Sequence, residues 1–165
     1  MYLDYQLREP DRTDIQDLDP GEHVCCIYRN DREHALLLAS FVDDGLRRGE
    51  KVGCTVQEDM VDPFYEALRS LGTEPQPKLS TGQLEIWKPE DFYLENGRFR
   101  LEDMLAKLWD SISRTEQEGY PRSRLAGGLT PDLARRIDTD ELLEYEVASA
   151  RPPADSWGSP PAPYG

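Results

Sequence analysis

The sequence predicts an α/β fold, with an open, mostly parallel sheet of about four strands and helices on both of its faces. Short apolar runs rich in Val, Ile and Tyr alternate along the chain with longer amphipathic stretches, which is the order typical of parallel sheets. One complete strand–helix–strand unit is formed by His23–Tyr28, residues 31–48 and Val52–Val56. The chain is also 38% hydrophobic, which is enough for the core of one domain.

The run His23–Tyr28 is predicted to be the first buried strand, because it is apolar, rich in β-favouring residues and preceded by a Pro-Gly turn. A parallel strand is covered by helices on both faces, so we expect Cys25 and Cys26 to be small core residues. Either Asn30 or Asp31 is expected to cap the helix that follows.

The rest of the chain continues the alternation of strands and helices. We expect strands at 83–87 and 124–130, and helices at 61–71, 101–117 and 139–150. The apolar stripe is clearest in 101–117, and Thr139 is expected to be the N-cap of the last helix. The stretch 73–78 holds two prolines and is predicted to be a loop. Asn96 and Gly97 favour a turn with positive φ.

Charge and composition exclude several classes of partner. The 19 basic residues are outnumbered by 33 acidic ones and the net charge is −14, so we expect no binding to nucleic acid or to an anionic membrane. No run approaches the ~20 apolar residues that span a bilayer, and no signal-peptide pattern is present. We therefore expect a cytoplasmic protein whose three cysteines are free thiols. Residues 1–19 are predicted to be a flexible acidic leader, 20–150 the folded domain and 151–165 a disordered Pro-rich tail.

Five motifs, in order, resemble those of one known family. The chain is similar to the MEDS domain, the methanogen/methylotroph DcmR-type sensory domain, at Gly21–Tyr28, Leu46–Val52, Ser80–Leu84, Glu95–Phe99 and Leu142–Glu146. The resemblance covers roughly residues 19 to 150 and implies a RecA/KaiC-like fold that has lost its nucleotide machinery. It also implies a sensory role exercised through a histidine kinase, an anti-sigma-type protein or a transcriptional regulator.

The chain departs from that family pattern in three places, one of which is that no attached output domain is expected. Gly127, Gly128 and Leu129 stand where the family has Gly-Glu-Met, and Pro131 stands in the place of its Trp. The family continues past the last motif into a further apolar strand and a helix, whereas a Pro-rich stretch follows here. The resemblance therefore predicts a domain shortened at its C-terminal side, with one sheet edge bare.

The residues favour recognition over catalysis. A phosphate loop needs Gly-x-x-x-x-Gly-Lys-Ser/Thr after the first strand, but the stretch 29–34 has no glycine and carries acidic residues. We expect no cofactor and no metal, since adjacent cysteines on a strand point apart and the paired spacing of a zinc site is missing. A thiol-sensing role for Cys25 beside His23 is left open. A thiol-dependent hydrolase is the least favoured alternative, because a buried strand gives no access.

The carboxyl edge of the sheet is the expected ligand site, because doubly wound folds bind ligands there. The candidate ligand-binding residues are strand-end or motif residues, and none is expected to be catalytic: His23, Cys25, Tyr28, Arg29, Glu58, Trp87, Thr130 and Glu144. We expect a non-catalytic module that senses an unidentified small molecule in signal transduction or transcription regulation. The alternative is a protein-interaction module or decayed paralogue without a ligand.

Overall fold

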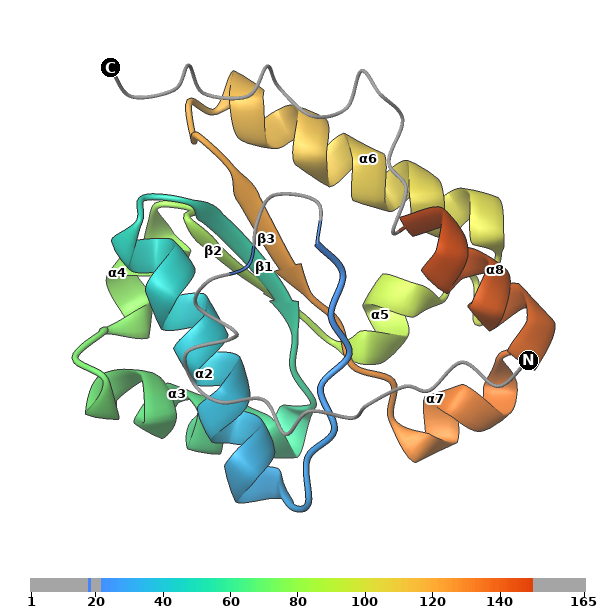
Figure 1. Cartoon of the computed structure of the whole chain (residues 1–165), viewed down its shortest axis with the longest axis horizontal. Coiled ribbons are helices and arrows are strands. Elements are labelled where there is room, and N and C mark those ends of the chain that lie inside the picture. The colour runs from blue at the N-terminus through green and yellow to red at the C-terminus, as the bar shows by residue number, and fades with distance from the viewer. Residues whose placement is uncertain (1–17, 19–21, 150–165) are drawn as a thin grey trace.

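A computed structural model describes residue 18 and residues 22–149. Three parallel strands form one sheet in the order β2-β1-β3: β1 (Lys51–Thr55) in the centre, β2 (Leu84–Trp87) and β3 (Ser123–Ala126) at its edges. Two groups of helices lie on opposite sides of the sheet (Figure 1). The predicted α/β class and open parallel sheet are therefore confirmed, but the described residues form three strands rather than about four.

The segment His23–Tyr28 is not a strand, and its prediction as the first buried strand was wrong. The segment is extended and exposed, and both Cys25 and Cys26 are exposed instead of lying in the core. β-Favouring composition makes a segment suitable for a strand, but a strand also needs a hydrogen-bonding neighbour. β1 is already paired with β2 on one side and β3 on the other, and among the described residues His23–Tyr28 pairs with neither edge strand.

Helix α2 (Asp31–Arg47) begins at a cap that the sequence predicts, since the Asn30 side chain accepts a hydrogen bond from Glu33 N at 3.0 Å. The helix approaches the sheet closely at Gly45, where a Cβ atom would lie 2.9 Å from Val52 and 2.7 Å from Arg124. Because Val52 belongs to β1 and Arg124 to β3, α2 covers both strands.

The first core lies between α2, β1 and helix α3 (Val61–Ser70), which matches the predicted helix 61–71 closely. Its fully buried members come from all three elements: Ala39, Val42, Val52, Cys54, Phe64 and Leu68. Burying a side chain of Val, Leu or Phe size stabilises a fold by roughly 1.5–3 kcal/mol. These contacts hold α2 and α3 on one face of the sheet.

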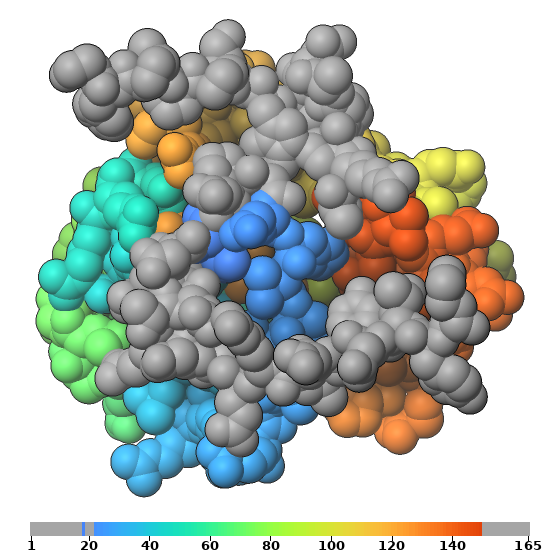
Figure 2. Space-filling model, viewed as in Figure 1, coloured from blue at the N-terminus to red at the C-terminus, as the bar shows by residue number. Residues whose placement is uncertain are grey.

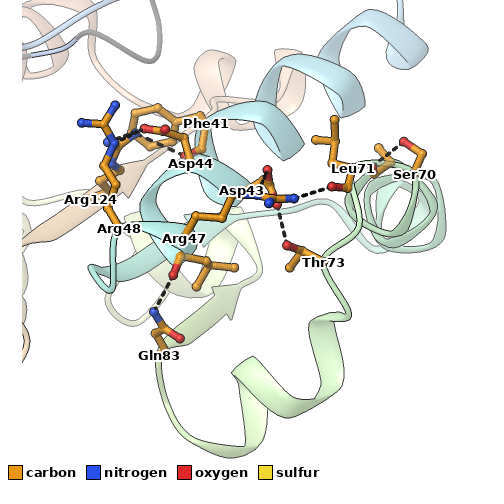
Figure 3. Close-up of polar contacts among 12 residues, drawn as sticks. Phe41, Asp43, Asp44, Arg47, Arg48, Ser70, Leu71, Thr73, Gln83 and Arg124 are labelled. Atoms are coloured by element: carbon orange, nitrogen blue, oxygen red, sulfur yellow. Dashed lines mark hydrogen bonds and ion pairs between the residues drawn. The ribbon is translucent and has the colours of Figure 1, made fainter.

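Polar contacts fasten α2 to the chain that follows α3 (Figure 3). Arg47 pairs with Asp43 at 2.7 Å and donates to the Leu71 carbonyl, while the Thr73 hydroxyl donates to Asp43. The Gln83 side chain donates to the Leu46 carbonyl at 3.1 Å. The end of α2 is thereby held against the start of β2.

Three short helices begin with a proline in their first turn: α4 (Pro75–Ser80), α5 (Pro89–Tyr93) and α7 (Pro131–Arg136). The prediction of a loop at 73–78 was therefore wrong over α4. Proline interrupts the interior of a helix, but at the first position its missing N–H has no helical partner to lose. Prolines that seem to break the chain can thus start a helix.

The second core lies on the other side of the sheet, among α5, α7, α6 (Leu101–Gln117) and α8 (Thr139–Ser149). The predicted helices 101–117 and 139–150 match α6 and α8. Asp138 rather than Thr139 caps α8, because its side chain accepts from Asp140 N at 2.9 Å. Asn96 and Gly97 adopt the predicted positive φ, 50° and 75°. The buried core residues are Tyr93, Leu94, Phe99, Met104, Leu133, Ile137 and Tyr145.

Charged groups close the amino-terminal end of the sheet. Arg124 is 9% exposed and forms ion pairs with Glu50, itself 6% exposed, and with Asp44 at 2.7 Å. Lys51 pairs with Glu85 at 2.9 Å and with Glu118. Burial alone lowers the pKa of Lys51, but hydrogen bonds to Glu118 and Glu85 outweigh it and leave that pKa raised. No helix in the described part of the chain is long and apolar enough to cross a membrane.

Candidate ligand site at the carboxyl edge of the sheet

The loops after the three strands come together at the carboxyl edge of the sheet, as parallel topology requires. The chain after β1 is held to β2 by a hydrogen bond from Val56 N to the Trp87 carbonyl at 2.9 Å. It is held to the loop after β3 by a hydrogen bond from Gly128 N to Thr55 Oγ1, also 2.9 Å. These two contacts set the spacing of the loops around the edge.

An open groove of about 570 Å³ lies between these loops, within the size range of small-molecule sites. Its walls come from the short helix η1 (Glu58–Met60) and the residue before it, from the start of α5, and from α7. The lining residues are mostly charged or polar: Gln57, Glu58, Lys88, Glu90, Thr130, Pro131, Asp132 and Arg135.

Exposed ion pairs dominate the walls of the groove. Lys88 Nζ lies 2.8 Å from Glu58 Oε2, and Arg135 lies 3.7 Å from Asp132. The hydrogen bond between Lys88 and Glu58 lowers the pKa of the Glu58 carboxyl and raises that of the Lys88 ammonium. Both groups are therefore charged at neutral pH. Exposed pairs of this kind contribute little to stability, so a ligand that carries charge can replace one partner at small cost.

Thr130 builds the wall instead of presenting a free hydroxyl. Its side chain is buried, and Oγ1 accepts a hydrogen bond from Leu133 N at 3.0 Å as the N-cap of α7. Leu133 is fully buried in the second core. The cap thus anchors α7, and α7 places Asp132 and Arg135 at the groove.

Two of the predicted ligand-binding residues, Glu58 and Thr130, line this groove. Trp87 lies at the same edge, but its ring stacks on Phe92 at 5.1 Å and fills the space over Gly53. The indole therefore packs against the sheet and is not among the residues that line the groove.

The remaining predicted residues lie outside the groove. His23 forms an ion pair with Glu146 of α8 at 3.1 Å, and Tyr28 stacks on His34 at 4.1 Å. Arg29 pairs with Glu33 at 3.1 Å. Cys25 and Glu144 are exposed, the latter on α8. None of these side chains is among the residues that line the groove.

Pro131, Asp132 and Arg135 are lining residues that the sequence analysis missed, because it predicted no helix between the last strand and residue 139. A local signal was present. Thr130 followed by Pro131 is the typical N-cap and first-position pair of a helix, and it marks where α7 begins.

The thiols differ in environment. Burial raises the pKa of Cys54 to about 12, so its thiol is protonated and unreactive at neutral pH. Burial, together with the charge of neighbouring Cys25, raises the pKa of Cys26. Among the residues that the structure describes, no group of three or more His, Cys, Asp or Glu side chains is placed to hold a metal ion.

The family profile described as "MEthanogen/methylotroph, DcmR Sensory domain", or MEDS, matches residues 22–151. This chain belongs to the MEDS family. The match spans the two cores, the sheet and the groove, so the whole described fold is that of a MEDS sensory domain. No curated protein and no solved structure shows a significant match to the chain.

Proposed function

We propose that this MEDS domain is a non-catalytic cytoplasmic sensor that binds a small polar molecule in the groove at the carboxyl edge of its sheet. The observation that carries the proposal is the groove itself: charged side chains from three separate loops converge at the edge where open α/β folds bind ligands. The occupied state would be passed to a partner protein, such as a histidine kinase, an anti-sigma-type protein or a transcriptional regulator.

The side chains that line the groove favour a ligand that carries both a positive and a negative group. The carboxylates of Glu58, Glu90 and Asp132 can bind a cationic group, while Lys88 and Arg135 can bind an anionic one. The exposed pairs between these residues leave each charge accessible. Amino acids and similar small zwitterions match this arrangement, whereas a polyphosphate would be repelled by the excess of carboxylates.

A sensory role without catalysis agrees with the chain before α2. The stretch from Arg29 to Asp31 carries no glycine to cradle a phosphate, and Arg29 is held by Glu33. The neutral Thr130 hydroxyl is engaged as a helix cap. The side chains of the groove are thus suited to hold a charged molecule more than to activate one.

Thermal-shift screening with a panel of amino acids, dicarboxylates and polyamines tests the proposal. A true ligand raises the melting temperature in a saturable way, because binding at a hundredfold excess over Kd adds about 2.7 kcal/mol to the free energy of unfolding. Lys88→Gln and Arg135→Gln should weaken that response at least tenfold. The matched control is Lys107→Gln, since Lys107 pairs with Glu95 at 3.1 Å on the surface away from the groove.

The alternative, an interaction module or decayed paralogue without a ligand, predicts a different result. No compound would shift the melting temperature, and the groove variants would behave like Lys107→Gln. Exposed apolar side chains on the segment before α2 and on α8 are the observation that favours an interaction role. If the protein hydrolysed ATP robustly and lost that activity when Arg32 was changed, both the sensor and the interaction-module hypotheses would be contradicted.

A further inference from the structure

β3 is an edge strand of the sheet. β1, paired on both sides, is buried at every position, whereas all four residues of β3 are only half-buried. Within the described residues, no strand pairs with β3 on the side away from β1. An open parallel edge presents unpaired backbone groups and is a template for another strand.

The hydrogen-bonding direction of each β3 residue follows from its pairing with β1. Lys51 N donates to the Arg122 carbonyl at 2.9 Å, so the backbone groups of Arg122 and Arg124 point toward β1. Backbone groups alternate in direction along a strand, and those of Ser123 and Leu125 therefore point outward. These two residues offer N–H donors and carbonyl acceptors to a further strand.

The exposed apolar side chains gather on three elements of the described chain. Every large hydrophobic side chain that is exposed among the described residues lies on the segment before α2, on α2 or on α8: Val24, Ile27, Tyr28, Leu36, Leu143 and Val147. On α8, Leu143 and Val147 are one turn apart and point outward, while Tyr145 packs into the core. A grouping of this kind marks an interaction surface.

These elements are joined into one rim. The segment before α2 is tied to α8 by the His23–Glu146 ion pair and to α2 by the stacking of Tyr28 on His34. α2 in turn reaches β3, because Arg124 lies over the Phe41 ring at 5.2 Å. Figure 2 shows the described segment (blue) at the surface between α2 and the red-orange α8.

The charge of the rim indicates which kind of partner protein can bind there. Between residues 22 and 33 and along α8 the acidic residues are Glu22, Asp31, Glu33, Asp140, Glu141, Glu144 and Glu146, and the basic ones are Arg29 and Arg32. A second copy would bring the same acidic rim and a net charge of −14 of its own, so like charges would oppose self-association. A basic partner meets the opposite charge at these carboxylates, while Arg122, exposed beside Ser123, adds a cation at the edge itself.

We propose that the outer edge of β3 receives an extended strand from a partner protein, in which apolar residues alternate with lysine or arginine. The backbone of that strand pairs with Ser123 and Leu125, its apolar side chains cover the exposed residues of the rim, and its cations face the carboxylates of α8. The inference deepens the proposed function by assigning its partner surface, which is separate from the ligand groove.

The test uses the full chain and a fluorescent peptide of about eight residues, alternating valine and lysine, which is long enough for one strand. Fluorescence anisotropy should show saturable binding, and amide exchange at Ser123 and Leu125 should slow when the peptide is bound. Ser123→Pro removes one outward N–H at the first position of an edge strand, where proline is tolerated. It should weaken binding about three- to tenfold, whereas Ser123→Ala, which keeps the N–H, should not.

A second pair of variants keeps the test decisive if Ser123→Pro does not fold. Glu144→Gln should weaken binding of the peptide, whereas Glu66→Gln should leave that binding unchanged. Glu66 is an exposed residue of α3, on the other side of the sheet. Three results would each overturn the proposal. The first is equal binding of a valine–glutamate peptide, and the second is no exchange protection in β3. The third is a dimer, seen in sedimentation, that Ser123→Pro abolishes. Because the groove variants are measured with small ligands, failure of the strand test leaves the ligand proposal standing, and the reverse also holds.

Discussion

Replacing Arg124 with methionine should destabilise the domain by about 3–5 kcal/mol, the usual cost of removing one partner from a buried ion pair. The side chain of Arg124 is 9% exposed and that of Glu50 is 6% exposed, so the Glu50 carboxylate would be left without its cation and with little water. Asp44 contributes less to the cost, because it keeps its ion pair with Arg48 at 2.9 Å. Methionine has a similar length and fills the space, which limits any cavity term.

Urea unfolding followed by circular dichroism measures this change. With a slope of about 2 kcal/mol per molar urea, the midpoint should fall by about 2 M. The double variant Arg124→Met/Glu50→Gln should recover at least 1 kcal/mol of the loss, because the stranded charge is then gone. A loss below about 1 kcal/mol for Arg124→Met, or a double variant no more stable than the single, would refute the assignment of a buried, mutually dependent pair.

Three further predictions concern the glycine in the central strand, the thiols and the buried tyrosine. Gly53→Ala should cost about 1–3 kcal/mol in urea unfolding, because its Cβ would lie 2.4 Å from the Trp87 ring, whereas Gly128→Ala, with nothing within 4 Å, should cost much less. A thiol reagent at neutral pH should modify Cys25 and Cys26 in the folded protein and Cys54 only after unfolding; rapid reaction of all three would contradict the burial of Cys54. Burial raises the pKa of Tyr145 to about 12, above its unfolded value near 10, so its contribution to stability should be complete below pH ~10 and lost as the pH rises toward ~12. Tyr145→Phe should flatten that alkaline fall, as followed by unfolding at several pH values.

The long helices could be predicted from the sequence because their determinants are local. The backbone hydrogen bonds of α2 and α6 close within the helix, and their apolar spacing marks the buried face. Asn30 at the start of α2 is a cap visible in the sequence. The central strand β1 was also predictable, since Val52–Val56 is apolar on alternate residues. One of the family motifs, Leu46–Val52, joins the end of α2 to β1.

The candidate site was predictable only in part. The carboxyl edge of a parallel sheet follows from topology, and Glu58 and Thr130 were placed there correctly because each follows a strand. Asp132 and Arg135 were missed because they depend on α7, a helix of six residues. Such a helix is too short to be stable alone and persists because Leu133 is buried in the second core.

The amino-acid sequence by itself determined which stretches of this MEDS domain favour helix and which favour strand. Only the tertiary structure decided which β-favouring stretches join the sheet. A helix satisfies its backbone within one segment, whereas a strand needs a neighbour, and a place beside that neighbour is a property of the assembled fold. β3, with the sequence Ser-Arg-Leu-Ala, obtained such a place beside β1, while His23–Tyr28, which is richer in β-favouring residues, lies at the surface.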